Sequence, residues 1–291
     1  MENPSCSETL DDAGSQENLP CNGSAVETVT MKSETIHNRK RPKIEKEQSE
    51  DNKKTKKIYM YGNYDRYYGY RNINKAPIDD VRLQSFVARK DLIVGKRMLD
   101  IGCNNGTLTL LIAKYCKPAS MLGIDIDGML INDALRHQST MLKMSYSDGS
   151  TSDDRRSMEC VQFQRVNYAY KNAALLECEK PQYDVILCLS VTKWIHLNFG
   201  DDGMKLVFKR VYRQLHDEGI FILEAQPWNS YKRKKHLTEH IFENFKRIDF
   251  RPEQFNEHLL SDAVGFREMF ELKVESHTTK GFRRPIFVFR K

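Results

Sequence analysis

A glycine-rich turn carries the clearest chemical signal in this sequence of 291 residues. The segment LDIGCNNG, residues 99–106, follows a short apolar run and precedes a helix-like stretch. Glycines at Gly102 and Gly106 would let backbone N–H groups approach a ligand closely, at the sheet edge where open α/β folds bind ligands. The spacing is G-x-x-x-G rather than G-x-G-x-x-G, which weakens a dinucleotide-binding interpretation.

An acidic residue follows at the distance that a nucleoside ligand requires. Asp125 ends the apolar segment MLGID, 19 residues past Gly106, where a carboxylate can accept hydrogen bonds from ribose hydroxyls. Asp127 is better explained as the N-cap of the next helix. The two features in this order resemble the S-adenosylmethionine-binding pattern of class I methyltransferases. The alternative is a tight turn without a ligand and a solvated acid.

Three further segments combine aromatic, basic and amide residues. They are YGNYDRYYGYRN (61–72), LSVTKWIHLN (189–198) and LEAQPWNSYKRKK (223–235). Tyrosines interleaved with arginines suit stacking on bases and contacts to phosphates, although an aromatic lid packed on the core explains them equally well. The second and third segments follow expected strands, so they would lie at the same sheet edge as the glycine turn.

The elements that must position these residues alternate between strand and helix. Apolar runs predict strands at 97–102, 121–127, 161–166, 183–190 and 219–225, and helices at 107–115 and 201–216. Asp201 or Asp202 could cap the second helix. This alternation favours a mostly parallel sheet covered on both faces, with 266–274 and 286–290 paired antiparallel at one edge. The polar segment 138–159 predicts a mobile insertion loop.

Composition divides the chain into a tail and one domain. Residues 1–57 are polar and nearly free of aromatics, so we expect them to be disordered, and residues 58–291 to form the domain. Two basic clusters in the tail, at 39–43 and 53–57, resemble a two-part nuclear localisation signal, the alternative being a solvated basic tail. Setting aside the tail leaves 36 basic and 29 acidic side chains, a net charge of +7 that favours an anionic partner. No apolar run is long enough to span a membrane.

The three aromatic and basic segments, in this order around the glycine turn, resemble the bicoid-interacting, or methylphosphate capping enzyme, family of RNA 5′-phosphate methyltransferases. The resemblance covers residues 58–291 and includes the closing KGFRRPIFVF (280–289). It implies a class I, Rossmann-like α/β fold with a mostly parallel seven-stranded sheet and an antiparallel edge strand. It also implies methyl transfer from S-adenosylmethionine to the 5′-terminal γ-phosphate of a small noncoding RNA, 7SK in the best-known branch, which caps and stabilises that RNA.

The resemblance also implies where the protein acts and with what. Because the tyrosine-rich segment is present in full, the sequence resembles the branch of the family that methylates 5′-triphosphates rather than the branch that methylates 5′-monophosphates. Localisation would be nuclear, and a La-related protein is an implied partner in a 7SK-type ribonucleoprotein. No membrane and no metal are expected to take part.

Position by position, the resemblance carries a cofactor site onto this sequence. Arg82 would meet the cofactor carboxylate, although outside the family it would read as an exposed helix cation, and Tyr168 would flank the adenine ring. The full set of expected cofactor-binding residues is Tyr67, Arg82, Gly102, Asn104, Asp125, Ile126, Asn167, Tyr168 and Leu189.

To methylate a phosphate, an enzyme mainly has to position the phosphate oxygen next to the methyl group, and it needs little acid–base catalysis. The acceptor oxygen is already anionic at neutral pH, so we expect no indispensable general base. Lys193 and Arg71 are predicted to hold the γ-phosphate, with Tyr67 or Tyr68 donating a hydrogen bond and Trp194 shaping the pocket; alternatively, Lys193 is a solvated cation at a strand end. The expected RNA-binding residues are Tyr64, Arg71, Gln226, Trp228, Lys232 and Arg233.

The sequence alone leaves three other functions to consider. A non-catalytic RNA-binding scaffold could keep the methyltransferase fold within a small nuclear ribonucleoprotein. A nucleotide-dependent oxidoreductase would need a pyrophosphate-binding loop that the sequence lacks. Methylation of a small molecule leaves the tyrosine-rich segment and the basic run Lys232–Lys235 unexplained.

Overall fold

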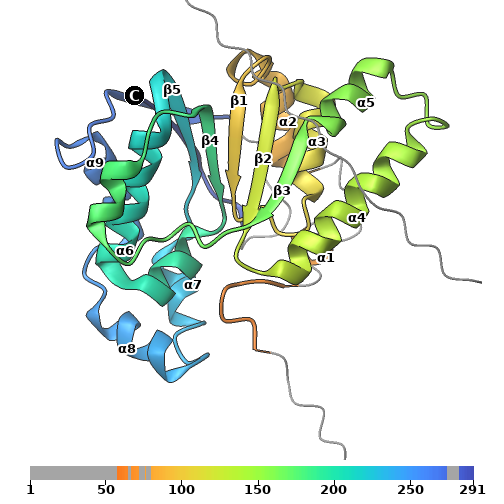
Figure 1. Ribbon diagram of the computed structural model, residues 1–291. Helices are drawn as coiled ribbons and strands as arrows, with labels where there is room; N and C mark the ends of the chain where they lie inside the picture. Colours follow the sequence, from red (N-terminus) through yellow and green to blue (C-terminus); the bar gives the residue numbers. More distant parts are fainter. Residues whose placement is uncertain (1–57, 65–66, 72–75, 77–79, 274–281) are drawn as a thin grey trace, which may run out of the picture. The chain divides into compact units, whose positions relative to one another are not determined.

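The computed structural model describes residues 58–64, 67–71, 76, 80–273 and 282–291 (Figure 1). The expected disordered tail and its two basic clusters lie outside these residues, so both remain predictions. Within the described part, no helix is long and apolar enough to cross a membrane.

A seven-stranded sheet forms the centre of the domain, with the order β3-β2-β1-β4-β5-β7-β6. Five strands run parallel, and β7 pairs antiparallel with both β5 and β6. This is the expected mostly parallel, Rossmann-like sheet with an antiparallel edge, and the fold prediction is confirmed. The strands are β1 (Arg97–Ile101), β2 (Ser120–Asp125), β3 (Val161–Arg165), β4 (Tyr183–Leu189), β5 (Leu215–Glu224), β6 (Glu268–Leu272) and β7 (Ile286–Arg290).

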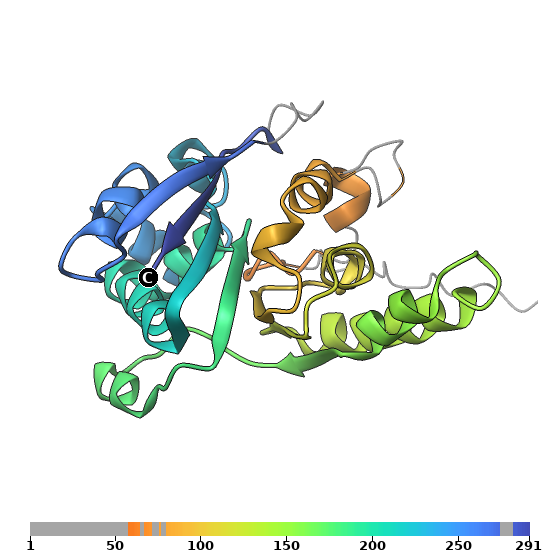
Figure 2. The ribbon, with the colours of Figure 1, turned by 90° about the horizontal axis from the view of Figure 1, so that it is seen from above.

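Helices cover both faces of the sheet (Figure 2). On one face α2 and α3 build a core with Phe86, Leu110 and Ile112, and on the other α6 and α9 build a second core with Phe208 and Phe255. The α-helices are α1 (Tyr67–Arg71), α2 (Val81–Ala88), α3 (Thr107–Cys116), α4 (Gly128–Met144), α5 (Ser152–Glu159), α6 (Thr192–Gln214), α7 (Trp228–Lys232), α8 (Glu239–Arg247) and α9 (Phe255–Leu260); short 3₁₀ turns are η2 (Lys90–Leu92), η3 (Ala173–Cys178) and η4 (Pro252–Gln254).

Helix α6 consists of two helical parts divided at Gly200, whose φ of 68° and ψ of −170° are not helical. The part after Gly200 corresponds to the helix predicted at 201–216, and the part from Thr192 to Gly200 was not predicted. Asp201 does not cap the start of the part after Gly200. Instead, one Asp201 oxygen lies 2.7 Å from Nε2 of His196, and the other accepts hydrogen bonds from the N–H groups of Asp249 and Phe250. After residue 201, apolar residues recur every three or four positions, which is the pattern that predicts a helix. The segment KWIHLN (193–198) is buried along its whole length, so its sequence lacks this pattern.

The expected insertion loop at 138–159 is mostly helical, so its loop assignment is wrong. Residues 138–144 complete α4, and 152–159 form α5. Thr151 and Asp154 form a capping box at the start of α5, and Met158 is buried. A strong N-terminal cap offsets the poor apolar content of this helix.

Candidate functional site

The glycine turn between β1 and α3 adopts backbone angles that favour glycine. Gly102 and Gly106 have φ of 76° and 71°. A Cβ on Gly102 would lie 2.7 Å from Cγ2 of Val191, and one on Gly106 would lie 2.6 Å from Cζ of Phe163. Both positions therefore need glycine for their conformation, Gly102 also for its close contact with the loop after β4 and Gly106 for its close contact with β3.

Asp125, at the end of β2, supports this turn. One carboxylate oxygen accepts a hydrogen bond from the N–H of Asn104, and the other from the N–H of Asp127, both at 3.0 Å. Burial raises the pKa of Asp125, and these backbone donors oppose the rise. A carboxylate oxygen has room for a second donor, so Asp125 can also accept from a ligand. Asp127 accepts from Met129 N–H at 2.8 Å and caps α4, as predicted.

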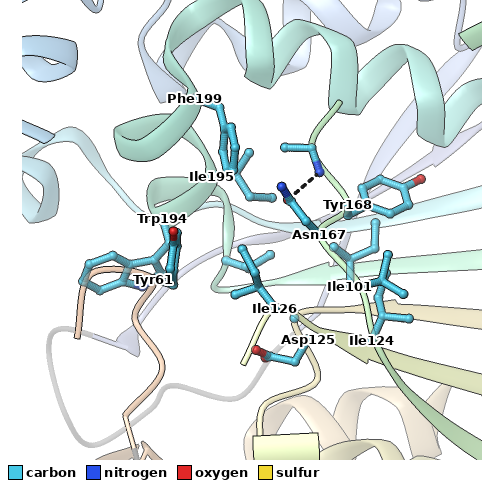
Figure 3. Close-up of a pocket in the computed structure, with 14 residues that line it drawn as sticks. Tyr61, Ile101, Ile124, Asp125, Ile126, Asn167, Tyr168, Trp194, Ile195 and Phe199 are labelled. Carbon is cyan, nitrogen blue, oxygen red and sulfur yellow. Dashed lines mark hydrogen bonds between the residues drawn. The ribbon is translucent and has the colours of Figure 1, made fainter. Parts of the chain in front are cut away.

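A first pocket of about 470 Å³ opens between this edge of the sheet and α6 (Figure 3). Its walls are largely apolar, which suits an aromatic base, and Asp125 lies at one side. The lining residues include the predicted Gly102, Asp125, Ile126, Asn167 and Tyr168, together with Tyr61, Ile101, Ile124, Val166, Ala169, Val191, Trp194, Ile195 and Phe199.

Two predicted residues of this pocket have side-chain contacts of their own. The Asn167 side chain accepts a hydrogen bond from Ala169 N–H at 3.1 Å. The Tyr168 hydroxyl donates to Gln214 Oε1 at 2.7 Å, and its ring lies under the Arg210 guanidinium at 4.3 Å. Its ring points away from Phe199 and Trp194 (Figure 3). The expected flanking of adenine by the Tyr168 ring is therefore not supported, and Phe199 and Ile195 of α6 face this space instead.

A second, more polar pocket of about 550 Å³ adjoins the first and shares Tyr61, Gly102, Asp125, Val191 and Trp194 with it. It contains five further predicted residues: Tyr67, Tyr68, Arg82, Asn104 and Leu189. The Oδ1 atoms of Asn63 and Asn104, both in its lining, are buried without a hydrogen-bond partner among the described residues. Two such acceptors fit an ammonium group of a ligand.

The two tyrosines of α1 differ in their electrostatic surroundings. Burial would raise the pKa of Tyr67, but the guanidinium groups of Arg71 and Arg82 outweigh it, so this pKa lies below its usual value. Burial raises the pKa of Tyr68, whose hydroxyl accepts a hydrogen bond from Leu108 N–H at 3.3 Å. Tyr67 is therefore the better hydrogen-bond donor toward an anion.

A buried cluster of charges lies behind these pockets. Arg82 is 2% exposed and makes a bidentate pair with Asp80, at 3.0 and 2.8 Å, so it is no solvated helix cation. Glu224, which ends β5 and is 1% exposed, lies 3.2 Å from Arg71 and 3.6 Å from Arg82. It also lies 3.8 Å from Arg284 and accepts from the Ser190 hydroxyl at 2.8 Å.

This cluster corrects the expectation for Arg71. Its guanidinium is 1% exposed, lies between Glu224 and Asp80, and donates to the Tyr67 hydroxyl at 3.3 Å. Arg71 lines neither of the two pockets above nor the third pocket described below, because two buried carboxylates hold it inside the domain. Direct contact with a phosphate or RNA is therefore not supported for Arg71.

A third pocket, which we call the cationic pocket, continues from the second past Tyr67, Ser190 and Trp194. Its volume is about 820 Å³. Three cations and no carboxylate occur among the described residues that line it: Tyr59, Tyr64, Tyr67, Ser190, Lys193, Trp194, Gln226, Lys234, Phe282 and Arg284. This pocket has the chemistry of an anion site.

Lys193, at the start of α6, is the most perturbed cation of this pocket. Burial, and then the charges of Arg284 and Lys234, lower its pKa to about 7. Its ammonium lies 4.4 Å from the centre of the Trp194 ring, and no carboxylate pairs with it among the described residues. The side chain is 8% exposed, so the alternative of a solvated strand-end cation is wrong.

The other predicted RNA-binding residues divide into two groups. Tyr64 lines the cationic pocket, and Lys232 and Arg233 are exposed at the end of α7. Gln226 lines the pocket too, but its side chain is bonded to Thr192, to Lys193 N–H and to the Ser190 carbonyl. It positions the loop that carries Lys193.

Trp228 lies outside the cationic pocket. Its ring stacks on Phe245 of α8, with ring centres 4.9 Å apart, and packs in a small apolar cluster with Tyr231 and Ile241. The structure gives it a packing role, and its predicted RNA contact is not supported by this position.

Sequence reasoning missed three residues of the site. Arg284 lines the cationic pocket, and Glu224 and Asp80 hold the charge cluster together. Lys234 also lines the cationic pocket, and it belongs to the basic run Lys232–Lys235 that the sequence already pointed to. Arg284 and Glu224 stood inside quoted motifs, but only the fold shows that they meet.

Comparisons with known proteins agree with this arrangement. Residues 99–221 match the family model "Methyltransferase domain", and residues 183–291 match "Bicoid-interacting protein 3 (Bin3)". The U6 snRNA methylphosphate capping enzyme Amus of Drosophila melanogaster is 47% identical over 233 residues, which cover 80% of this chain and 75% of that protein. The 7SK snRNA methylphosphate capping enzyme of Homo sapiens is 39% identical over 283 residues.

The match to the human protein covers 82% of this chain and 40% of the human protein, so the chain spans less than half the length of that relative. RNA 5′-monophosphate methyltransferase of Homo sapiens is 27% identical over 176 residues. Among solved structures, N-methyltransferase NodS from Bradyrhizobium japonicum has a TM-score of 0.46 and 12% identity, covering 75% of this chain and 99% of that chain.

The methyltransferase-domain match confirms the expected enzyme class and its cofactor, S-adenosylmethionine. The donor set fits this molecule. The apolar pocket suits the base, and Asp125 suits the ribose. The two amide oxygens that lack a partner among the described residues suit the ammonium, and Arg82 suits the carboxylate. Among the described residues, no group of three or more His, Cys, Asp or Glu side chains is placed to hold a metal ion.

Proposed function

The chain belongs to the bicoid-interacting protein 3 family of methyltransferases, and on that premise we propose that it methylates the 5′-terminal γ-phosphate of a small nuclear RNA. The methyl group of S-adenosylmethionine would pass to a terminal phosphate oxygen, which leaves S-adenosylhomocysteine and a capped RNA. The two pockets on either side of Asp125 would hold the cofactor, and the cationic pocket would hold the RNA end.

One observation carries this proposal: an anion pocket is continuous with the cofactor pocket. Tyr67, Ser190 and Trp194 line both, and the cationic pocket presents Lys193, Lys234 and Arg284 without a carboxylate in its described lining. An acceptor with several negative charges, such as a triphosphate, matches this wall better than a neutral hydroxyl or amine.

The residues of the chain would supply orientation rather than proton transfer. When bound, S-adenosylmethionine supplies an electrophilic methyl group on a positively charged sulfur. A terminal phosphate oxygen is ionised at neutral pH, so no base has to generate the nucleophile. Lys193 and Tyr67 would fix the phosphate where the two pockets meet, and Trp194 would close the wall beside it. Correct placement of two reactants contributes on the order of 7 to 11 kcal/mol.

The relatives bear on which RNA is methylated. The relatives that are 47% and 39% identical to this chain are named as methylphosphate capping enzymes of U6 and 7SK snRNA. The relative named as an RNA 5′-monophosphate methyltransferase is only 27% identical. We therefore propose a 5′-triphosphorylated small nuclear RNA of the 7SK or U6 kind as the substrate. Nuclear localisation follows from such a substrate, and a La-related protein remains a proposed partner.

The remaining roles stay proposals as well. Arg82, Asn104, Leu189 and Ile126 would contact the cofactor from the positions they hold in the two pockets. Tyr64, Lys232 and Arg233 would contact RNA beyond the 5′ end.

The test offers the purified protein labelled S-adenosylmethionine and one RNA sequence with three different 5′ ends: triphosphate, monophosphate and hydroxyl. We expect label on the triphosphate form alone, removable by an enzyme that cleaves the triphosphate bridge. Label on internal nucleotides, or on the hydroxyl form, would refute the proposal. Tight binding of triphosphorylated RNA without any label would favour the non-catalytic scaffold.

A further inference from the structure

Asn198 ends the motif LSVTKWIHLN and is 6% exposed, although it is not in the lining of any of the three pockets. Its side-chain nitrogen donates two hydrogen bonds, to Met60 O at 2.9 Å and to Trp194 O at 2.8 Å. Both partners are carbonyl oxygens, which can only accept, so the NH₂ group of the amide must face them. Asn198 therefore ties the segment 58–64 to the first part of α6.

The two partners of Asn198 belong to the two walls that the ligand pockets share. Trp194 lines all three pockets. From the segment 58–64, Tyr61 lines the first two pockets and Tyr64 lines the cationic pocket. A change in the spacing between this segment and α6 would therefore alter every pocket at once.

The segment 58–64 reaches from α6 to the start of α4. Near its beginning, Met60 is held by Asn198. Near its end, Asn63 donates at 2.5 Å to Asp127, the residue that caps α4. Both residues between these attachment points line the second pocket. The hydrogen bond from Asn198 is thus the attachment on the α6 side of that pocket.

Helix α8 holds the same turn of α6 through its backbone. Carbonyl groups at the end of a helical stretch need partners from outside the helix, and the first part of α6 ends at a residue whose backbone angles are not helical. The Leu197 carbonyl accepts from Asn244 at 3.0 Å, and the Asn198 carbonyl lies 2.9 Å from Nε2 of His240. These bonds join the backbone of the turn to α8, whereas the Asn198 side chain joins the turn to Met60.

We infer that Asn198 is a positioning residue, which fastens the segment 58–64 against α6 and thereby sets the affinity of the protein for both of its ligands. Without the hydrogen bond to Met60, the segment would spend part of its time away from Trp194. A site that is assembled for only part of the time binds its ligand more weakly, in proportion to the assembled fraction. The inference does not depend on which anion occupies the cationic pocket.

The substitution Asn198→Ser separates the two hydrogen bonds of this side chain. A serine hydroxyl in a helix can donate to the carbonyl four residues earlier, so this variant keeps a bond to Trp194 O and loses the bond to Met60. We expect the affinity for S-adenosylhomocysteine, measured by calorimetry on the full chain, to fall by about fivefold to tenfold, the equivalent of one hydrogen bond. The affinity for a short 5′-triphosphorylated RNA should fall by a similar factor.

The fluorescence of Trp194 reports on the segment directly once Trp228, the other of the two tryptophans, is replaced. In a Trp228→Phe background, release of the segment should admit water to the Trp194 indole, which is 7% exposed, and shift its emission to longer wavelength. The matched control is Asn244→Ser, which loses a hydrogen bond to the same turn but none to the segment. A purely structural role of Asn198 predicts equal effects of the two substitutions.

We expect longer-wavelength emission and weaker binding in Asn198→Ser, and neither change in Asn244→Ser. Unchanged emission or unchanged S-adenosylhomocysteine affinity in Asn198→Ser, or the same changes in Asn244→Ser, would overturn the inference. If Asn198→Ser does not fold, the isosteric Asn198→Asp, which lacks both donors when ionised, must show the same changes. Failure of the unsubstituted protein to bind the triphosphorylated RNA would refute the proposed function alone.

Discussion

The ammonium of Lys193 lies in a nearly buried, positively charged environment, where a further positive charge is unfavourable. It is nearly buried, with two other cations facing the same pocket and the Trp194 ring as its nearest favourable contact. Such a site costs free energy in the free protein and becomes favourable once an anion enters. The position of Lys193 therefore costs stability in the free protein and supports its proposed role in binding an anion.

Replacing Lys193 by alanine should reduce kcat/KM for 5′-triphosphorylated RNA by about 10- to 100-fold, the range expected when one hydrogen bond to a charged group is lost. Affinity for S-adenosylmethionine should stay within about twofold, since Lys193 is in the lining of the cationic pocket rather than the cofactor pocket. Methyl transfer and calorimetry measure the two quantities. The exposed Lys209 of the same helix supplies the control, Lys209→Ala. An equal loss of cofactor affinity would contradict the role of Lys193.

The pH dependence of RNA binding follows from the same amine. Its pKa is about 7 in the free protein, and a bound phosphate must raise this pKa toward the ordinary value for lysine. At pH 8 the bound state then holds more protons than the free state, so binding should take up as much as about one proton, and affinity should fall as pH rises above 7. Calorimetry in buffers of different ionisation enthalpy counts the protons. Lys193→Arg, which stays charged, should show no uptake; uptake of the same size in this variant would contradict the assignment.

At the scale of elements, the segment before the sheet covers the site. We call residues 58–64 and α1 the N-terminal strap. Met60 O accepts a hydrogen bond from Asn198 at 2.9 Å, Asn63 donates to Asp127 at 2.5 Å, and Tyr64 packs edge-on against Trp194. Strap residues line all three pockets. The strap is therefore part of both ligand sites.

Gly62 fixes how closely the strap approaches Trp194. Its φ is 70°, and a Cβ there would lie 2.1 Å from Nε1 of Trp194. Gly62→Ala should push the strap away and raise KM for RNA and cofactor by about 10-fold or more, which corresponds to a loss of about 1.4 kcal/mol or more in binding. Gly95→Ala is the matched control, with the same φ of 70° and no atom within 4 Å of the new Cβ. If Gly62→Ala and Gly95→Ala show the same KM values, the close approach of Gly62 to Trp194 is not required for binding of RNA or cofactor.

The sequence predicts the layers of the fold and much of the cofactor edge, because both depend on local patterns. Gly102 and Asp125 follow apolar strands at a recognisable spacing, and their positions agree with the structure. Contacts between distant segments were not predictable in this way. Arg71 looked like an RNA ligand beside the tyrosines, yet Glu224, 153 residues away, holds it inside the domain. Tyr168 likewise follows a strand as expected, but Gln214 and Arg210 turn its ring away.

At the scale of the whole molecule, positive charge continues outward from the cationic pocket. Lys234 lines that pocket, and its neighbours Lys232, the last residue of α7, and Arg233, which follows α7, are exposed. RNA leaving the pocket would meet these side chains first. They would hold the RNA backbone by charge without reading its sequence.

The double variant Lys232→Gln/Arg233→Gln should make the dependence of log affinity on log salt shallower by about 1.4, or about 0.7 for each phosphate contact with a single strand. Binding of a triphosphorylated RNA at several salt concentrations measures this slope. Lys90→Gln/Lys96→Gln is the control, since both lysines are exposed near the opposite end of β1. Equal slopes in the two double variants would show that Lys232 and Arg233 do not contact RNA.

The central claim is that one continuous site brings the cofactor and a phosphate end together. A crystal structure of the protein with S-adenosylhomocysteine and a 5′-triphosphorylated oligonucleotide measures this directly. We predict that the cofactor lies against Gly102 and Asp125 and that a terminal phosphate oxygen lies about 2.7–3.2 Å from Nζ of Lys193. A structure with the cofactor in that place but the 5′ end bound outside the cationic pocket would contradict the account.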